Sequence, residues 1–254
     1  MNFVRAFGRR NAAQTHIPAT ARGDRIYAIG DVHGRLDLLE KMLERIGDHS
    51  RELPPARTHL VVLGDLIDRG PASADVLRTL HDIQRKKRNV VVLLGNHEEI
   101  MLEALKGDIG ALEAWLDFGG VQTLESFGIA LPDDPRDMPI LIEEMRRTIP
   151  RDLREWLAGL PLSVRSGDYF FCHAGIKPGV PLRRQQRDDL LWIRGEFLES
   201  DQDHGVVIVH GHSVEHEVKS LPNRIGIDSG AYSTGKLTAL YLEGAVRDVL
   251  TVTD

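Results

Sequence analysis

Five short apolar runs in this sequence share one feature, because each ends directly in a small group of polar residues. In chain order the polar groups are "GDVHGR" (30–35), "GDLIDRG" (64–70), "GNHEE" (95–99), "HAG" (173–175) and "HGHS" (210–213). Apolar runs of this length are typical of buried strands. In open α/β sheets ligands bind at the carboxyl ends of the strands, so we expect these distant groups to meet at one site.

The first half of the chain alternates strand-like and helix-like patterns. Strands are expected at 25–30, 59–64 and 90–95, and helices at 36–47, 73–88 and 97–106. Such alternation predicts βαβ units and a first sheet that is largely parallel.

The second half begins with a mainly helical stretch, 107–160, which is interrupted by a Pro- and Asp-rich loop at 131–139. Short strands are then expected at 169–173, 206–210, 218–221, 224–228, 237–242 and 245–252. We predict one α/β domain over 24–254, built from two packed sheets with helices outside. Residues 1–23 are expected to form a flexible tail, and the helical insert 107–160 to border the site.

Charge and composition narrow the class of protein. A net charge of −6 argues against a general nucleic-acid or membrane-surface binder, which usually carries a basic excess. The single cysteine, Cys172, excludes an internal disulfide and favours a reducing compartment. No apolar run approaches the ~18 residues of a membrane helix. We therefore expect a cytoplasmic protein without membrane or nucleic-acid partners, and a monomer.

The polar groups contain residue types that bind metal ions. Carboxylate oxygens, an amide oxygen and imidazole nitrogens come from Asp31, His33, Asp65, Asn96, His173 and His212. This mixed set, without a thiolate, suits Mn, Fe or Zn, whereas a site for Mg or Ca would be built from oxygen alone. Asp31 and His33 lie two apart on an extended segment, so their side chains point the same way.

Taken singly these groups are weak signals, since Asn96 for example is also a good helix N-cap. Together, and in this order, they resemble the signature blocks of the phosphoprotein phosphatase family of metallophosphoesterases. The resemblance is strongest to the compact bacterial and phage branch of serine/threonine protein phosphatases. "DLLWIR" (189–194) and "GIDSGAYSTGKLTAL" (226–240) extend it over essentially all of 25–250.

The resemblance implies a four-layer αββα sandwich, with two mixed β-sheets flanked by helices, and a centre of two divalent metal ions. Mn is the expected metal, with Fe or Zn as alternatives. By position, Asp31 and His33 would bind the first ion and Asp65 would bridge both. The second ion would be bound by Asn96, His173 and His212.

The same resemblance implies the catalytic roles. His97 would be the general acid, oriented by Asp68, while Arg69 and Arg194 would bind the phosphate. His210 matches no such role and is interpreted as a core histidine. We expect hydrolysis of phosphate monoesters, above all phosphoserine or phosphothreonine in proteins, by direct attack of a metal-bound hydroxide. No nucleophilic cysteine is needed for that reaction, so Cys172 is interpreted as a core residue.

Two other functions remain open. A symmetrical dinucleoside tetraphosphatase shares the fold and most ligands, but members of that group typically lack the position of Asp68 and have Asp at the position of Glu98. An inactive phosphoprotein-binding scaffold would have lost a ligand or His97, and none is missing. No motif in the sequence distinguishes phosphoserine, phosphothreonine and phosphotyrosine as the substrate. The loop 176–188 and Tyr232 are expected near the crevice, and the basic run 183–187 fits either a solvated loop or attraction of acidic substrate residues.

Overall fold

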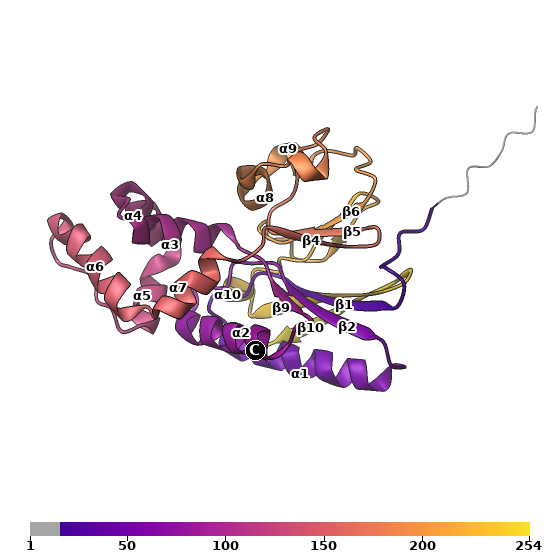
Figure 1. Ribbon diagram of the computed structural model, residues 1–254, viewed down its shortest axis with the longest axis horizontal. Helices are drawn as coiled ribbons and strands as arrows, with labels where there is room; N and C mark the ends of the chain where they lie inside the picture. Colours follow the sequence, from indigo (N-terminus) through magenta and orange to yellow (C-terminus); the bar gives the residue numbers. More distant parts are fainter. Residues whose placement is uncertain (1–15) are drawn as a thin grey trace, which may run out of the picture.

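The computed structural model describes residues 16–254, and its strands form two sheets that pack face to face (Figure 1). The first sheet has the strand order β10-β9-β1-β2-β3. Its strands are β1 (Asp24–Ile29), β2 (Arg57–Val62), β3 (Val90–Val92), β9 (Lys236–Glu243) and β10 (Val246–Thr253). The prediction of a largely parallel sheet holds only for β1, β2 and β3, because β9 and β10 return antiparallel to them.

The second sheet has the order β4-β5-β6-β8-β7 and is also mixed. Its strands are β4 (Ser163–Ser166), β5 (Tyr169–Cys172), β6 (Val207–His210), β7 (Lys219–Ser220) and β8 (Arg224–Gly226). The strands β5, β6 and β8 run parallel, and β4 and β7 are antiparallel edges. The sequence patterns did not predict β4, a short edge strand without a buried residue.

Alternating side chains of β1 show how the layers are held together. Ile26 and Ala28 lie in the apolar cluster between the two sheets, whereas Tyr27 and Ile29 face the helices. The helix α1 (Leu36–Glu52) and the helix α2 (Ser73–Lys86) contribute to that outer cluster. On the far side, α8 (Arg187–Trp192) and α9 (Gly195–Leu198) cover the second sheet, which completes the predicted four-layer αββα sandwich.

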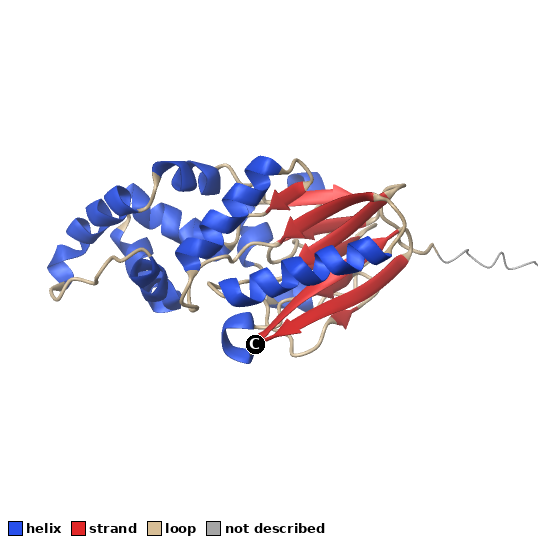
Figure 2. Cartoon of the chain, turned by 90° about the horizontal axis from the view of Figure 1, so that it is seen from below, coloured by secondary structure: helices blue, strands red, loops and turns tan. Residues whose placement is uncertain are grey.

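The stretch 107–160 is helical, and it projects beyond one end of the sheets (Figures 1 and 2). It follows α3 (Asn96–Lys106) and consists of α4 (Ile109–Trp115), a π-helical turn (Leu116–Gly120), α5 (Val121–Ser126), α6 (Met138–Thr148) and α7 (Arg151–Ala158). The predicted loop at 131–139 contains a 3-10 turn, Pro135–Asp137, and ends where α6 begins. A short helix, α10 (Ala231–Thr234), precedes β9.

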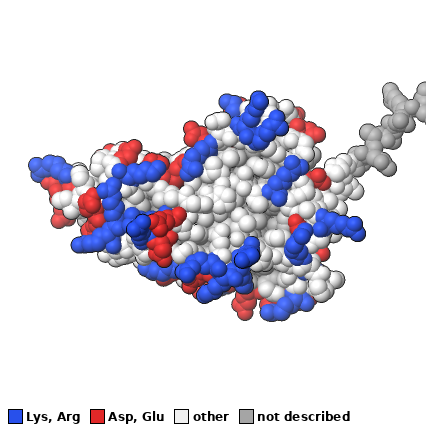
Figure 3. Space-filling model, viewed as in Figure 1, with Lys and Arg blue, Asp and Glu red and all other residues white. Residues whose placement is uncertain are grey.

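Of the predicted N-terminal tail, 1–23, residues 1–15 lie outside the described part of the chain. Beyond residue 15 the chain is attached to the domain, since Ala19 accepts from the Asp168 backbone N–H at 2.9 Å and the Thr20 N–H donates to Gly244 at 3.0 Å. None of the helices within 16–254 is long and apolar enough to cross a membrane. On the face shown in Figure 3 basic and acidic side chains are interspersed, as expected for a chain with a small net charge.

Candidate metal centre and active site

The loops after β1, β2, β5 and β6 and the start of α3 converge, and the loops after β1, β2 and β6 contain strained backbone conformations. Five non-glycine residues in the described part of the chain have positive φ, and they are His33, Asp65, Asp68, Arg69 and His212. All five were singled out from the sequence. Because this conformation is unfavourable for residues with a Cβ, it marks places where the surrounding structure holds a side chain in position. The Asp65 carbonyl does part of this, accepting from the Val32 and His33 backbone N–H groups at 3.0 and 2.9 Å.

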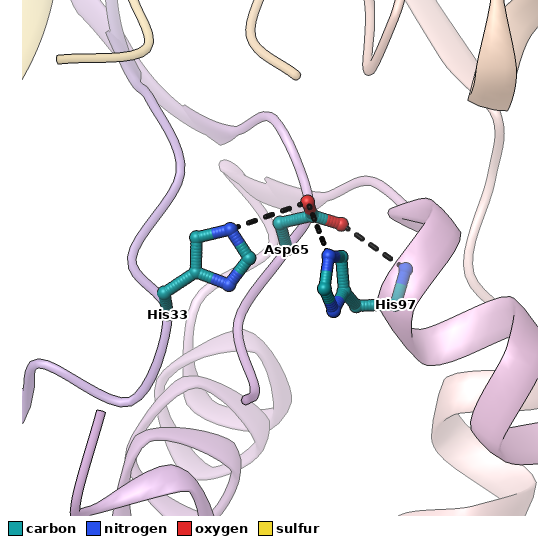
Figure 4. A group of neighbouring side chains, drawn as sticks. All are labelled: His33, Asp65 and His97. Carbon is teal, nitrogen blue, oxygen red and sulfur yellow. Dashed lines mark hydrogen bonds and ion pairs between the residues drawn. The ribbon is translucent and has the colours of Figure 1, made fainter. Parts of the chain in front are cut away.

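Asp65 lies at the centre of the site and its two oxygens face different histidines. Its Oδ2 is 3.5 Å from His33 Nε2 and 3.8 Å from His97 Nε2 (Figure 4). Its Oδ1 is 3.3 Å from His173 Nε2. Two sets of possible ligand atoms therefore share this one carboxylate, and they are His33–Asp65–His97 and Asp65–His173–His212.

Asn96 lies beside His173 and His212 of the second set, and the chemistry of these three side chains favours a cation. The Nδ1 of His173 lies 2.9 Å from the Leu63 carbonyl, which requires a proton on Nδ1 and leaves a lone pair on Nε2. That Nε2 is 2.8 Å from Asn96 Oδ1, which is 2.9 Å from His212 Nδ1. Acceptor atoms that turn toward one another repel unless a cation lies between them, so these residues fit a metal ion.

His33 is held in the same way. Its Nδ1 lies 2.8 Å from the Ile67 carbonyl, so Nε2 carries the lone pair and faces Asp65. Burial lowers the pKa of His33 to about 3 and that of His212 to about 2. Both rings are therefore neutral at physiological pH, which is the protonation state a metal ligand needs.

Asp31 is buried against the second half of the site. Its Oδ2 accepts from the His212 backbone N–H at 3.0 Å, while its Oδ1 has no hydrogen-bond partner within residues 16–254. Burial and the nearby Asp228 and Asp65 carboxylates raise the pKa of Asp31 well above its usual range. The Nε2 of His212 is likewise buried and unpartnered among the described residues. The orphaned Asp31 Oδ1 fits a ligand of a cation, although Asp31 does not join either of the two sets around Asp65.

His97 and Asp68 form a buried pair beside Asp65. The Nδ1 of His97 lies 2.6 Å from Asp68 Oδ2, and Asp68 is fully buried. Asp68 also accepts from Trp115 Nε1 at 2.9 Å and from Thr123 Oγ1 at 2.6 Å. Although burial opposes protonation, the Asp65 and Asp68 carboxylates raise the pKa of His97 above its ordinary value. This ring can therefore hold a proton near neutral pH.

Arg69 lies over the two histidines of the first set. Its Nη1 and Nη2 each lie 3.1 Å from a ring nitrogen, that of His33 and that of His97 respectively. The Tyr232 ring is 4.5 Å from the guanidinium carbon, so this tyrosine does border the site. Arg194 is exposed at the start of α9, and its charge contributes to the lowered pKa of His212 after burial and His173. The structure thus brings all the predicted site residues to one region.

Several residues at this site were not assigned a role from the sequence. Glu98 is fully buried, and its carboxylate accepts from four backbone N–H groups, those of Asp65, Leu66, Ile67 and Gly95. Asp228 follows β8, and burial with the nearby Asp65 raises its pKa to about 6. An apolar strand ending in "GID" is the same signal that identified the other ligands, so Asp228 was detectable. The insert residues Trp115 and Thr123 carry no such signal.

The remaining interpretations concern two buried residues, Cys172 and His210, and the basic run 183–187. Cys172 is fully buried, and burial raises the pKa of its thiol. His210 is buried beside Phe197, with Nδ1 3.0 Å from the Gly211 carbonyl. In the basic run 183–187, Arg187 pairs with Glu99, whereas Arg183 and Arg184 are exposed.

Comparisons with known proteins agree with this architecture. The family model of calcineurin-like phosphoesterases matches residues 24–240, and the chain belongs to that family. It is 33% identical over 153 residues to the symmetrical bis(5'-nucleosyl)-tetraphosphatase of Methylococcus capsulatus, a match that covers 60% of this chain and 44% of the relative. It is 27% identical to serine/threonine-protein phosphatase 2 of Escherichia coli, over 84% of this chain and 90% of the relative. The chain therefore spans less than half of the tetraphosphatase but nearly all of the phosphatase.

A solved structure shows the same fold. The crystal structure of a cold-active protein-tyrosine phosphatase from a psychrophilic Shewanella species superposes with a TM-score of 0.60 at 19% sequence identity. The superposition covers 92% of this chain and 84% of the Shewanella chain.

Proposed function

We propose that this member of the family hydrolyses phosphate monoesters with the help of two divalent metal ions. The ions would be held by Asp31, His33, Asp65, Asn96, His173 and His212, with Mn as the expected metal and Fe or Zn as alternatives. When bound, such ions lower the pKa of coordinated water to about 7 and offset the negative charge of the phosphate. The orphaned Oδ1 of Asp31 and the lone pairs of His173 Nε2, Asn96 Oδ1 and His212 Nδ1, which face one another, support this ligand set.

The contact between His97 and Asp68 is the observation that carries the choice of substrate. Asp68 fixes the tautomer in which Nδ1 carries a proton, and its charge favours a second proton on Nε2. His97 would give that proton to the leaving oxygen of the substrate. An alkoxide from serine or threonine is a strong base and depends on such a proton. A phosphate leaving group is a weak base and hardly does.

Arg69 and Arg194 would bind the oxygens of the transferred phosphate. A planar guanidinium matches two phosphate oxygens at once. Arg69 comes from the turn after β2, and Arg194 comes from the segment that precedes α9. The two charges would therefore approach the phosphate from different elements and fix its orientation for in-line attack.

A symmetrical dinucleoside tetraphosphatase is the second candidate, and the named relatives favour it. Proteins from Methylococcus capsulatus and Acidovorax at 33% and 36% identity carry that name, against 27% for the Escherichia coli phosphatase. The matched fraction of each relative's length favours the phosphatase instead, because the match covers 90% of the phosphatase and only 44% of the Methylococcus capsulatus tetraphosphatase. The Asp68–His97 pair is the physical reason for placing the monoester first.

Turnover of a phosphoserine peptide and of diadenosine tetraphosphate, measured side by side in Mn-containing buffer, separates the candidates. We expect the higher kcat/KM for the phosphopeptide, and a strong preference for the dinucleotide would establish the second candidate. Binding of the phosphopeptide without turnover of either substrate would indicate the inactive scaffold.

His97→Asn provides the internal control for the acid role. We expect it to reduce turnover of phosphoserine by about 10²–10⁴. The loss should be much smaller for p-nitrophenyl phosphate, whose leaving group hardly needs a proton. An equal loss on both substrates would remove His97 from this role.

A further inference from the structure

We propose that Glu99 is a positioning residue that fixes Arg194 at the phosphate site through Trp192 and Arg187. The inference rests on the proposed role of Arg194 in phosphate binding. It adds a residue that has no part in the ligand set or in proton transfer. Glu99 lies in the first turn of α3, two residues after His97.

Both oxygens of the Glu99 carboxylate make contacts within the protein. Its Oε2 accepts from Trp192 Nε1 at 2.6 Å, and its Oε1 pairs with Arg187 Nε. Only 13% of the Glu99 side chain is exposed. Glu103, one turn later on the same helix, is 47% exposed and within residues 16–254 forms an ion pair only with Lys106. The two glutamates therefore share a helix but differ in environment.

One carboxylate thus holds both ends of α8, since Arg187 is its first residue and Trp192 its last. Figure 1 shows α3 at the root of the insert and α8 above the second sheet. The contact consequently ties together two segments that are far apart in the sequence. The Trp192 ring lies 6.5 Å from the His212 ring, so the end of α8 is held against the candidate metal centre.

Arg194 follows two residues after Trp192 and is anchored on its other side as well. Its carbonyl accepts from the Phe197 and Leu198 backbone N–H groups at 2.9 Å each, and Phe197 is fully buried. The Arg194 residue itself is exposed. A fixed backbone at an exposed arginine is the arrangement expected for a group that binds a ligand rather than the protein.

Binding of inorganic phosphate to the metal-loaded protein tests this inference by calorimetry. We expect Glu99→Ala to weaken phosphate binding about tenfold, as the loss of a charge-assisted hydrogen bond would do. Metal content should stay at the wild-type level, and the substrate KM should rise more than kcat falls. Glu99→Gln, which keeps an acceptor for Trp192, should recover part of the affinity. Glu103→Ala is the matched control and should bind phosphate like the wild type.

The double variant of Glu99→Ala and Arg194→Ala distinguishes positioning from a general structural role. If Glu99 acts through Arg194, the double variant binds phosphate no more weakly than Arg194→Ala alone. Additive losses, or wild-type affinity in Glu99→Ala while Arg194→Ala is impaired, would overturn the inference only. Wild-type affinity in Arg194→Ala would also overturn the phosphate-binding role of Arg194.

Discussion

The two ends of β1 carry buried carboxylates in opposite electrostatic environments. At the amino end, Asp24 accepts from Arg57 Nε at 2.6 Å and from Ser166 Oγ at 2.9 Å. Burial opposes ionisation there, but these hydrogen bonds and the Arg57 charge keep the pKa of Asp24 below its ordinary value. Beyond the carboxyl end, burial and the carboxylates of Asp228 and Asp65 raise the pKa of Asp31.

The difference separates a structural charge from a functional one. Asp24 is complemented by the protein itself and is expected to stabilise the fold whether or not a ligand is present. Asp31 lies among like charges with one oxygen unpartnered, an arrangement that costs free energy of folding. Cations bound at the carboxyl end would supply the missing complement. The comparison therefore predicts that stability depends on metal at one end of β1 and not at the other.

The largest effect is expected at Asp65, whose oxygens face both candidate metal sets. Asp65→Asn should abolish hydrolysis and reduce the metal content of the purified protein, as measured by elemental analysis. Asp82→Asn, on the exposed face of α2, is the control and should change neither. An active Asp65→Asn variant with full metal content would contradict the bridging role.

Asp68 also lies near the candidate metal centre, but His97, Trp115 and Thr123 supply its hydrogen bonds. It should therefore behave differently from Asp65. Asp68→Asn should leave metal content unchanged but reduce turnover of phosphoserine, by at most the about 10²–10⁴-fold that general acid catalysis contributes. Because Asp68 raises the pKa of His97, the basic limb of the pH–rate profile should move to lower pH. Thr123→Val removes one donor but keeps the charge, so its profile should stay in place. A drop in bound metal would place Asp68 with the ligands instead.

Removal of metal by a chelator should destabilise the wild type. A site saturated at a hundredfold excess of metal over its Kd contributes about 2.7 kcal/mol to the free energy of unfolding. In the metal-free protein Asp31→Asn should be stabilising, because it removes one of several crowded negative charges. Thermal denaturation with Mn and with chelator measures both effects. If Asp31→Asn destabilised the chelated protein, the Asp31 carboxylate would be stabilised by protein groups, which would contradict this prediction.

The smallest effect is expected at Asp24. Asp24→Asn should lower the free energy of unfolding by about 1 kcal/mol at pH 7, with or without metal. A carboxyl whose folded pKa is depressed stabilises above its unfolded pKa, here 3.8, and loses this as pH falls through the lower folded pKa. The difference between wild type and variant should therefore vanish in acid. Denaturant unfolding at several pH values tests this, and Ser166→Ala should reproduce part of it.

Much of the fold and of the site was predictable because its signals are local. Apolar runs identified β1, β2, β3, β5 and β6, and the polar residues directly after them were the candidate ligands. The antiparallel pairing of β9 with β1 and of β10 with β9 was not predictable from those runs. An apolar run indicates a strand, but its direction in the sheet depends on the path of the segment that connects it to its neighbour. The edge strand β4 lacks an apolar run and was missed for that reason.

The chemical groups of the site and their positions directly after strands can be read from the chain, since both depend on neighbouring residues only. What those groups contact depends on the folding of distant segments against one another. Trp115 and Thr123 reach Asp68 from the insert, and Trp192 reaches Glu99 from α8. These contacts join segments whose separation along the chain follows no period, so the sequence carries no pattern from which to read them. Such contacts decide whether a buried carboxylate is hydrogen-bonded by the protein, like that of Asp68, or has an oxygen free for a cation, like that of Asp31.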